Sequence, residues 1–320
     1  MKRIKQMLMC AIATFALCFM FANVITVQAA DKETGKIYIN AIQDKKGNWK
    51  SNKKLRIETY ADASDGREYY YYWTSEPYNC ARSTIKVEYA AGDKISNLKV
   101  NKKKGLEASV VQTYSNGSDY GYTTIGVYAT KAGTYKVSFN IVGANGKSKG
   151  KQTVTVQAVN NNAVYKKLTF GGQTVFENTT TVKGGKKTTK TKDNTKVSGK
   201  AGKLKITPNS QYKITGIIVR TVGSNGKYSY KKIKNGKTIT LSKGYGYIYK
   251  TASGHNGTDV KKYTNVYVSY KDKFFGNTIT YSITSKRGKK EVKYVHKNGV
   301  TGEKTVYYDA GSSFTLWQYK

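Results

Sequence analysis

The sequence reads Lys131-Ala132-Gly133-Thr134-Tyr135-Lys136-Val137-Ser138-Phe139 where its β-strand pattern is clearest. From Tyr135 onward an apolar side chain stands at every second position, so these side chains point to one face of a strand. Similar alternating runs follow one another after residue 30, and none shows the 3.6-residue apolar spacing of an amphipathic helix. Many are separated by Asn-Gly, the dipeptide that tight hairpin turns favour. The fold class is therefore predicted to be all-β.

The first residues have the features of a cleaved signal peptide. Three cations precede the apolar run Met7–Ala22, and Val27-Gln28-Ala29 then places small residues at a cleavage site. A membrane anchor is the alternative, although the run is shorter than the roughly 20 residues that span a bilayer. No second hydrophobic segment and no Leu-Pro-x-Thr-Gly sorting signal follow. We expect residues 1–30 to be removed and the protein to be secreted, remaining extracellular or at the cell surface without a covalent anchor.

The quoted run also carries a resemblance to a known family. Tyr135 stands two residues before the inward-facing Val137, as does the tyrosine at the E–F corner of immunoglobulin-type sandwiches, which bonds back to the chain. Ile95–Val100 and Gln152–Val156 resemble an early strand and the closing strand of that fold. Residues 84–158 thus resemble the bacterial Ig-like domains of secreted Gram-positive, clostridial-type surface proteins. The resemblance implies an Ig-like fold and a surface or secreted location, and it brings no catalytic residues.

Two β-sandwich-like domains are expected after the signal peptide. The polar run Val159-Asn160-Asn161-Asn162-Ala163 breaks the strand pattern and marks the boundary. The first domain, residues 31–159, combines an N-terminal strand extension with the Ig-like Greek-key unit. Residues 160–163 form the linker. The second domain, residues 164–320, is β-rich and strongly basic, and it shows no immunoglobulin-type corner.

The charge of the chain predicts an anionic partner. Lys and Arg number 56 against 19 Asp and Glu, a formal net charge of +37. Residues 31–158 hold 21 basic and 12 acidic residues, whereas residues 159–320 hold 32 and 7, so the second domain carries most of the field. The charge is densest between Lys183 and Lys205, a stretch with one acid that is either a mobile loop or an exposed hairpin. Its lysines are the polyanion-binding candidates: Lys183, Lys186, Lys187, Lys190, Lys192, Lys196, Lys200, Lys203 and Lys205.

The chemistry of these cations narrows the class of partner. Only five cations after residue 30 are Arg, the residue that bidentate phosphate and base recognition favours. A signal peptide also argues against genomic nucleic acid. Lysine-dominated surfaces suit diffuse attraction to an anionic cell-wall polymer, an acidic polysaccharide or anionic lipid headgroups. The leading hypothesis is therefore a secreted, non-catalytic binding or adhesion module at the cell surface or in the extracellular matrix.

Two aromatic runs support an alternative, a carbohydrate-binding module for neutral glycans. Tyr69–Trp73 and Tyr245–Tyr249 place aromatic rings at alternate positions, where flat rings can stack on sugar faces. The glycan-stacking candidates are Tyr69, Tyr71, Trp73, Tyr245, Tyr247 and Tyr249. Ordinary cross-strand packing of the same rings is the competing interpretation.

Catalysis has little support in the sequence. Cys80 and the two histidines, His255 and His296, lie in no nucleophile motif, and no Gly-x-Ser-x-Gly is present. Zinc would require clustered Cys and His, and the acids of Asp62–Glu68 match no calcium loop. No catalytic residue, metal site or cofactor is expected, and a polysaccharide-directed hydrolase remains the least favoured alternative. The oligomeric state is not indicated.

Overall fold

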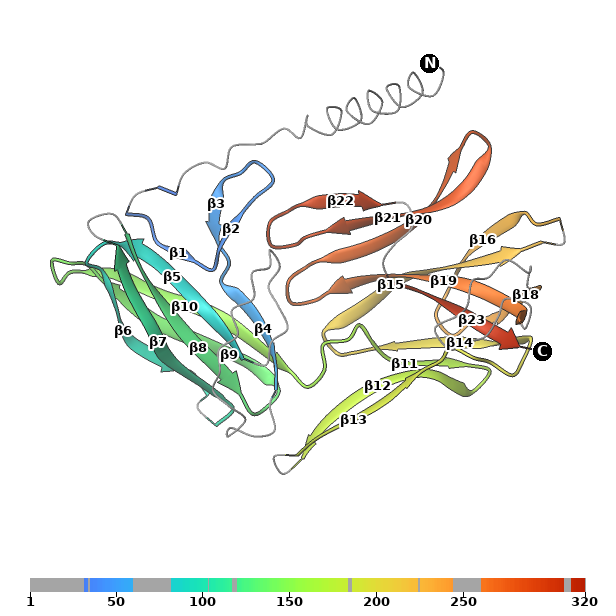
Figure 1. The fold of residues 1–320 in the computed structure, drawn as a ribbon, viewed down its shortest axis with the longest axis horizontal. Helices are drawn as coiled ribbons and strands as arrows, with labels where there is room; N and C mark the ends of the chain where they lie inside the picture. Colours follow the sequence, from blue (N-terminus) through green and yellow to red (C-terminus); the bar gives the residue numbers. More distant parts are fainter. Residues whose placement is uncertain are drawn as a thin grey trace, which may run out of the picture.

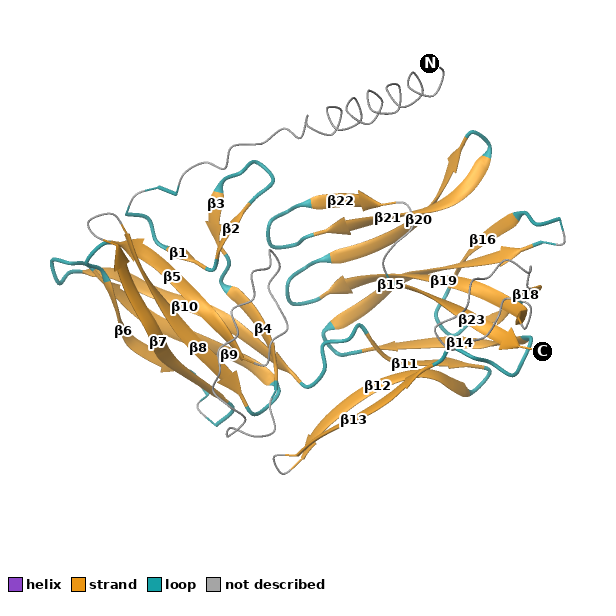
Figure 2. Cartoon of the chain, in the orientation of Figure 1, coloured by secondary structure: helices purple, strands orange, loops and turns teal. Residues whose placement is uncertain are grey.

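The computed structural model describes residues 32–33, 35–59, 82–102, 104–116, 120–183, 186–223, 225–243, 260–307 and 312–319. Every regular element in these residues is a β-strand, and no helix occurs among them (Figure 2). The strands form several sheets with sandwich-like arrangements, which confirms the predicted all-β fold class. The predicted signal peptide lies outside the described residues.

Eight strands of the first part form two facing sheets (Figure 1). One sheet has the order β1 (Tyr38–Ile39), β5 (Arg82–Ala90), β8 (Tyr120–Ala129), β7 (Leu106–Asn116). The other has the order β4 (Lys54–Glu58), β10 (Ser148–Val159), β9 (Gly133–Val142), β6 (Lys94–Val100). These orders match strands A, B, E, D and G, F, C of an immunoglobulin sandwich, with β4 added parallel to β10. A small hairpin, β2 (Ala41–Gln43) with β3 (Trp49–Ser51), follows β1.

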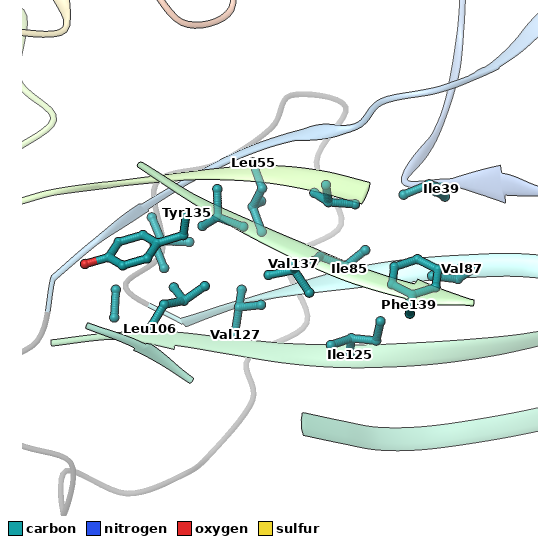
Figure 3. Packing of buried hydrophobic residues seen from close by; sticks show 14 of the residues in the cluster. Ile39, Leu55, Ile85, Val87, Leu106, Ile125, Val127, Tyr135, Val137 and Phe139 are labelled. Atoms are coloured by element: carbon teal, nitrogen blue, oxygen red, sulfur yellow. The ribbon is translucent and has the colours of Figure 1, made fainter. Parts of the chain in front are cut away.

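The alternation in the quoted run builds the core of this sandwich. Tyr135, Val137 and Phe139 of β9 are buried, and they face Ile85 and Ile125 of the opposite sheet (Figure 3). The Tyr135 hydroxyl donates a hydrogen bond of 2.7 Å to the carbonyl oxygen of Lys131. The predicted corner is therefore present, and its hydrogen bond fixes how the chain enters β9.

The second part contains two larger sheets. One has the order β13 (Lys186–Asp193), β12 (Gln173–Lys183), β11 (Tyr165–Phe170), β14 (Ala201–Pro208), β17 (Thr238–Thr240). The other has the order β16 (Tyr228–Ile233), β15 (Tyr212–Val222), β19 (Val260–Asp272), β20 (Thr278–Lys286), β21 (Lys289–Lys297), β22 (Lys304–Tyr307). Strands β18 (Ser242–Lys243) and β23 (Ser313–Tyr319) also pair with β19. The long strand β19 therefore organises the eight-stranded sheet.

A hydrophobic core joins these two sheets. Leu168 and Leu204 of the five-stranded sheet pack with Val266, Val268 and Leu316 of the eight-stranded sheet, and all five are buried. The opposite face of the eight-stranded sheet carries a separate, tyrosine-rich cluster built from Ile218, Tyr267, Tyr281, Val292 and Tyr294. The five-stranded sheet thus has one face in the core, and its alternate residues point away from it.

A buried ion pair connects the two parts of the chain. Arg56 of β4 and Asp272 of β19 are only 1% and 5% exposed, and two hydrogen bonds of 2.5 and 2.8 Å join the guanidinium to the carboxylate. Gln157 and Tyr212 accept further bonds from Arg56. Burial raises the pKa of Tyr212 to about 12 against the opposing effect of the Arg56 charge, so its hydroxyl stays neutral. We call this set of four residues the junction clasp.

Candidate functional site

The lysine-rich stretch forms an exposed hairpin. Strands β12 and β13 pair antiparallel from Phe176 opposite Asp193 to Lys183 opposite Lys186, and the hairpin projects from the second part of the molecule (Figure 1). Threonine recurs along both strands, and this β-branched residue fits a pleated, half-exposed surface. Of the two predicted alternatives, the exposed hairpin is the one that the structure contains.

Lysines from three strands share the outer face of the five-stranded sheet. The buried Leu168, Leu204 and Ile206 point inward, so their strand neighbours point outward. The register places Lys167 opposite Glu177, and Glu177 opposite Lys192. We define the basic face by its outward lysines: Lys167, Lys190, Lys192, Lys203 and Lys205.

The basic face carries an almost unopposed positive charge. Glu177 and Asp193 are the only acids between residues 165 and 208. Asp193 stands opposite Phe176 in the strand register, so its side chain points to the inner face of the sheet and not to the basic face. Glu177 is largely buried and forms an ion pair of 3.1 Å with Lys190. Neighbouring strands lie about 4.8 Å apart, so Lys167 of β11 and Lys205 of β14, on adjacent strands, fall within about one Debye length (~8 Å) of each other. The lysines of β13 lie three strand spacings, about 14 Å, from those of β14.

The predicted lysines do not all meet in this face. Lys196 lies at another edge, where it bridges to Trp317 of β23 and its Nζ stands 5.4 Å from the Tyr319 ring. Lys200 is exposed just before β14. The side chains of Lys183, Lys186 and Lys187 lie outside the described part of the structure.

Sequence reasoning missed one member of the basic face, Lys167. It lies in a separate segment from the dense stretch, and only the pairing of β11 between β12 and β14 brings it to the same face. The alternation of Lys167 with the apolar Leu168 was the available signal.

A polar cleft of about 540 Å³ lies between the two parts, beside β12. Its lining includes Thr134, Gln157, Asn161, Lys166 and Thr181, and no carboxylate is among the lining residues. The Asn161 side chain donates to the Thr180 hydroxyl at 3.1 Å, so the predicted linker is held against the hairpin. The cleft therefore offers amide, hydroxyl and ammonium groups to a polar ligand.

The eight-stranded sheet also carries one exposed and several half-buried aromatic residues. Tyr228 is 53% exposed, and the Arg220 guanidinium lies 4.7 Å from its ring centroid. Arg220 is held by hydrogen bonds of 2.8 and 3.1 Å to the Asn265 side-chain oxygen. On the same sheet, Tyr263 and Trp317 stack with their centroids 5.9 Å apart. None of these residues was singled out from the sequence, although Tyr228-Ser229-Tyr230 has the alternating pattern that marked the other runs.

The predicted glycan-stacking residues, Tyr69, Tyr71, Trp73, Tyr245, Tyr247 and Tyr249, lie outside the described residues, as do Cys80 and His255. His296 lies within β21, opposite Ile279 and Thr305. Within the described ranges, no group of three or more His, Cys, Asp and Glu is placed to hold a metal ion. The described residues also include no helix long and apolar enough to cross a bilayer.

Comparisons with known proteins show only remote likeness. No protein-family model matches the sequence, and no curated protein is similar to it. A crystal structure of the YadV chaperone matches 76% of this chain and 96% of its own, with 9% identity and a TM-score of 0.26. SGBP-B from the mixed-linkage glucan utilization locus of Bacteroides ovatus, solved with a mixed-linkage heptasaccharide, matches 71% of this chain and 64% of its own. Its identity is 10% and its TM-score 0.10, and neither likeness carries a functional argument.

Proposed function

We propose that this protein is a secreted, non-catalytic binding module that attaches through its basic face to anionic polymers of the cell surface or extracellular matrix. The ligand class is an anionic cell-wall polymer or an acidic polysaccharide. The observation that carries the proposal is the basic face itself, where five lysines from three strands share one side of the sheet with a single carboxylate that is already paired. The signal-peptide features and the resemblance to Gram-positive Ig-like surface proteins support export.

The type of cation supports a polymer rather than a small, specifically oriented anion. Lysine ammonium groups are strongly hydrated point charges on flexible stems, which attract many polyanion geometries. Arg56 and Arg220 are held instead by the junction clasp and by Asn265, and Arg287 lies in the turn between β20 and β21, in the eight-stranded sheet. Fork-shaped recognition of single phosphates or carboxylates is therefore absent from the basic face as described.

Replacing Lys190, Lys192, Lys203 and Lys205 together by Gln is expected to weaken polyanion binding at least about tenfold at low salt, because each lysine near an anionic surface contributes up to about 1 kcal/mol. The matched control replaces four exposed lysines of the first part by Gln: Lys131, Lys136, Lys147 and Lys151. Titrating each protein with purified wall teichoic acid and with alginate measures the effect and separates the two sources of anion.

Salt gives an independent check on the same proposal. At about 1 M salt the Debye length is about 3 Å, so the wild type is expected to release both polymers. Binding that persists at this salt concentration would contradict attachment by charge. Equal losses in the two quadruple variants would show that total charge, and not the basic face, holds the polymer.

A second candidate function, binding of a neutral glycan, is favoured by the exposed Tyr228 ring beside Arg220. If a sugar stacks there, Tyr228→Ala should weaken binding of a neutral oligosaccharide about two- to tenfold, since aromatic stacking contributes about 0.5–1.5 kcal/mol. The control is Tyr120→Ala, because Tyr120 is 43% exposed but lies on β8. Calorimetry at high salt measures the difference. Binding of anionic glycans only, or equal loss in both variants, would exclude this candidate.

A further inference from the structure

The strand β7 is an edge strand without a cation. It ends the sheet β1-β5-β8-β7, and its sequence Leu106–Asn116 contains one charged residue, Glu107. An edge strand displays unpaired backbone N–H and C=O groups, and proteins usually protect such edges with lysine or proline. Neither residue occurs in β7, although 53 Lys and Arg follow residue 30.

Every other described edge strand longer than three residues is protected. Cations occur in β4, β6, β13, β16 and β22, which end the other large sheets. Strand β23 lacks a cation, but its outer edge is covered, because Trp317 exchanges backbone hydrogen bonds with Thr195 and Val197. Among the long edge strands of the described residues, β7, eleven residues long, is therefore the one that neither contains a cation nor has its edge covered by a described segment.

The exposed apolar side chains gather at the same edge. Five large hydrophobic residues of the described chain are exposed, and three of them belong to the β7–β8 hairpin. Val110 is 49% exposed, Tyr114 42% and Tyr120 43%. Tyr114 stacks on Tyr122 of β8 at 5.2 Å, which holds its ring in place on the sheet.

We infer that β7 is a self-association edge, where two copies of this chain pair β7 with β7 across a two-fold axis and continue one sheet from the first copy into the second. The charge distribution points to a second copy as the occupant. Other long described edges would bring lysine against lysine when two copies meet, whereas β7 brings no cation to the contact. In such an antiparallel pair, Glu107 lies opposite Glu107 of the second copy only if the two-fold axis crosses β7 at that residue. An axis nearer the middle of β7 keeps the two carboxylates apart and avoids their repulsion.

One feature limits the extent of the pairing. The register of β7 against β8 shifts between Val110 and Gln112, so Val111 forms a bulge near the middle of the strand. A bulge bends an edge strand and interrupts its ladder of hydrogen bonds. The dimer is therefore expected to be reversible, with an affinity that rises with salt as the remaining positive charges of the two copies are screened.

Val110→Lys is the direct test, because it places a cation on each copy at the contact. Like charges across paired strands are unfavourable, so the dimer Kd is expected to rise about tenfold or more. The control is Val306→Lys, since Val306 is 42% exposed on β22, an edge strand that already contains Lys304. Tyr114→Lys is a second variant of the same edge.

Sedimentation equilibrium of the mature chain at low and high salt measures the Kd, and circular dichroism verifies that each variant is folded. The inference requires a dimer for the wild type and Val306→Lys, and weaker association for the two β7 variants. A wild type that remains monomeric at high salt would overturn it. Equal weakening by Val306→Lys would overturn it as well. Polyanion binding by the basic face is measured separately, so either proposal can fail alone.

Discussion

Replacing Asp272 by Ala is expected to lower the free energy of unfolding by about 3–5 kcal/mol, because it leaves the Arg56 charge buried without its partner. Arg56 is 1% exposed, so its guanidinium would be left in a buried environment. Asp272 also accepts hydrogen bonds from the backbone N–H groups of Phe274 and Phe275, at 2.8 and 3.0 Å. Its loss therefore frees the turn after β19 together with the contact between the two parts.

A second ion pair of the same chain provides the control. Glu177→Ala removes the partner of Lys190, whose side chain is 73% exposed, and exposed pairs contribute at most about 1 kcal/mol. The double variant Arg56→Met with Asp272→Leu removes both charges and is expected to recover most of the lost stability. Urea unfolding of the wild type, the two single variants and the double variant measures the free energy of unfolding of each. Similar losses for Asp272→Ala and Glu177→Ala would contradict the buried junction clasp.

Phe139→Ala is expected to destabilise the first sandwich by about 3–5 kcal/mol, since it removes a large side chain from a closely packed core. Phe139 is 1% exposed and packs among Ile39, Val87 and Ile125 between the two sheets (Figure 3). Truncating it leaves a cavity in the core, whose cost adds to the lost transfer free energy of the ring.

The matched substitution is Val306→Ala, which shortens an exposed side chain and is expected to change stability by less than about 0.5 kcal/mol. Thermal and urea unfolding measure both variants. Polyanion binding of folded Phe139→Ala should equal that of the wild type, because the basic face lies in the other part of the chain. A loss below about 1 kcal/mol would mean that Phe139 is not in the core.

The pattern of residues was sufficient for the fold class and for the first sandwich. Alternation with a period of two determines which face of a strand is buried, and the Tyr135 corner defines where one strand ends and the next begins. These are local features, so they can be read from neighbouring residues.

The candidate site was only partly predictable, because it depends on which strands become neighbours. The dense stretch indicated Lys190, Lys192, Lys203 and Lys205 as polyanion-binding candidates, and these four lie on the outer face of one sheet, but the register of β11 was needed to add Lys167. The ion pair of Arg56 could not be predicted from the sequence at all. Its sequence neighbours are those of an ordinary strand cation, and nothing near it signals a partner that lies 216 residues further along the chain.

The pairing of β23 with β19 has a consequence for how the chain acquires its structure. Leu316 is fully buried in the core of the second part, and it pairs with Thr264, roughly 50 residues earlier, so this contact has a large sequence separation. Until residues 313–319 have been synthesised, the eight-stranded sheet lacks this central contact and Val197 lacks its bond to Trp317. The second part is therefore expected to stay incompletely folded while the first sandwich, complete at residue 159, folds during synthesis.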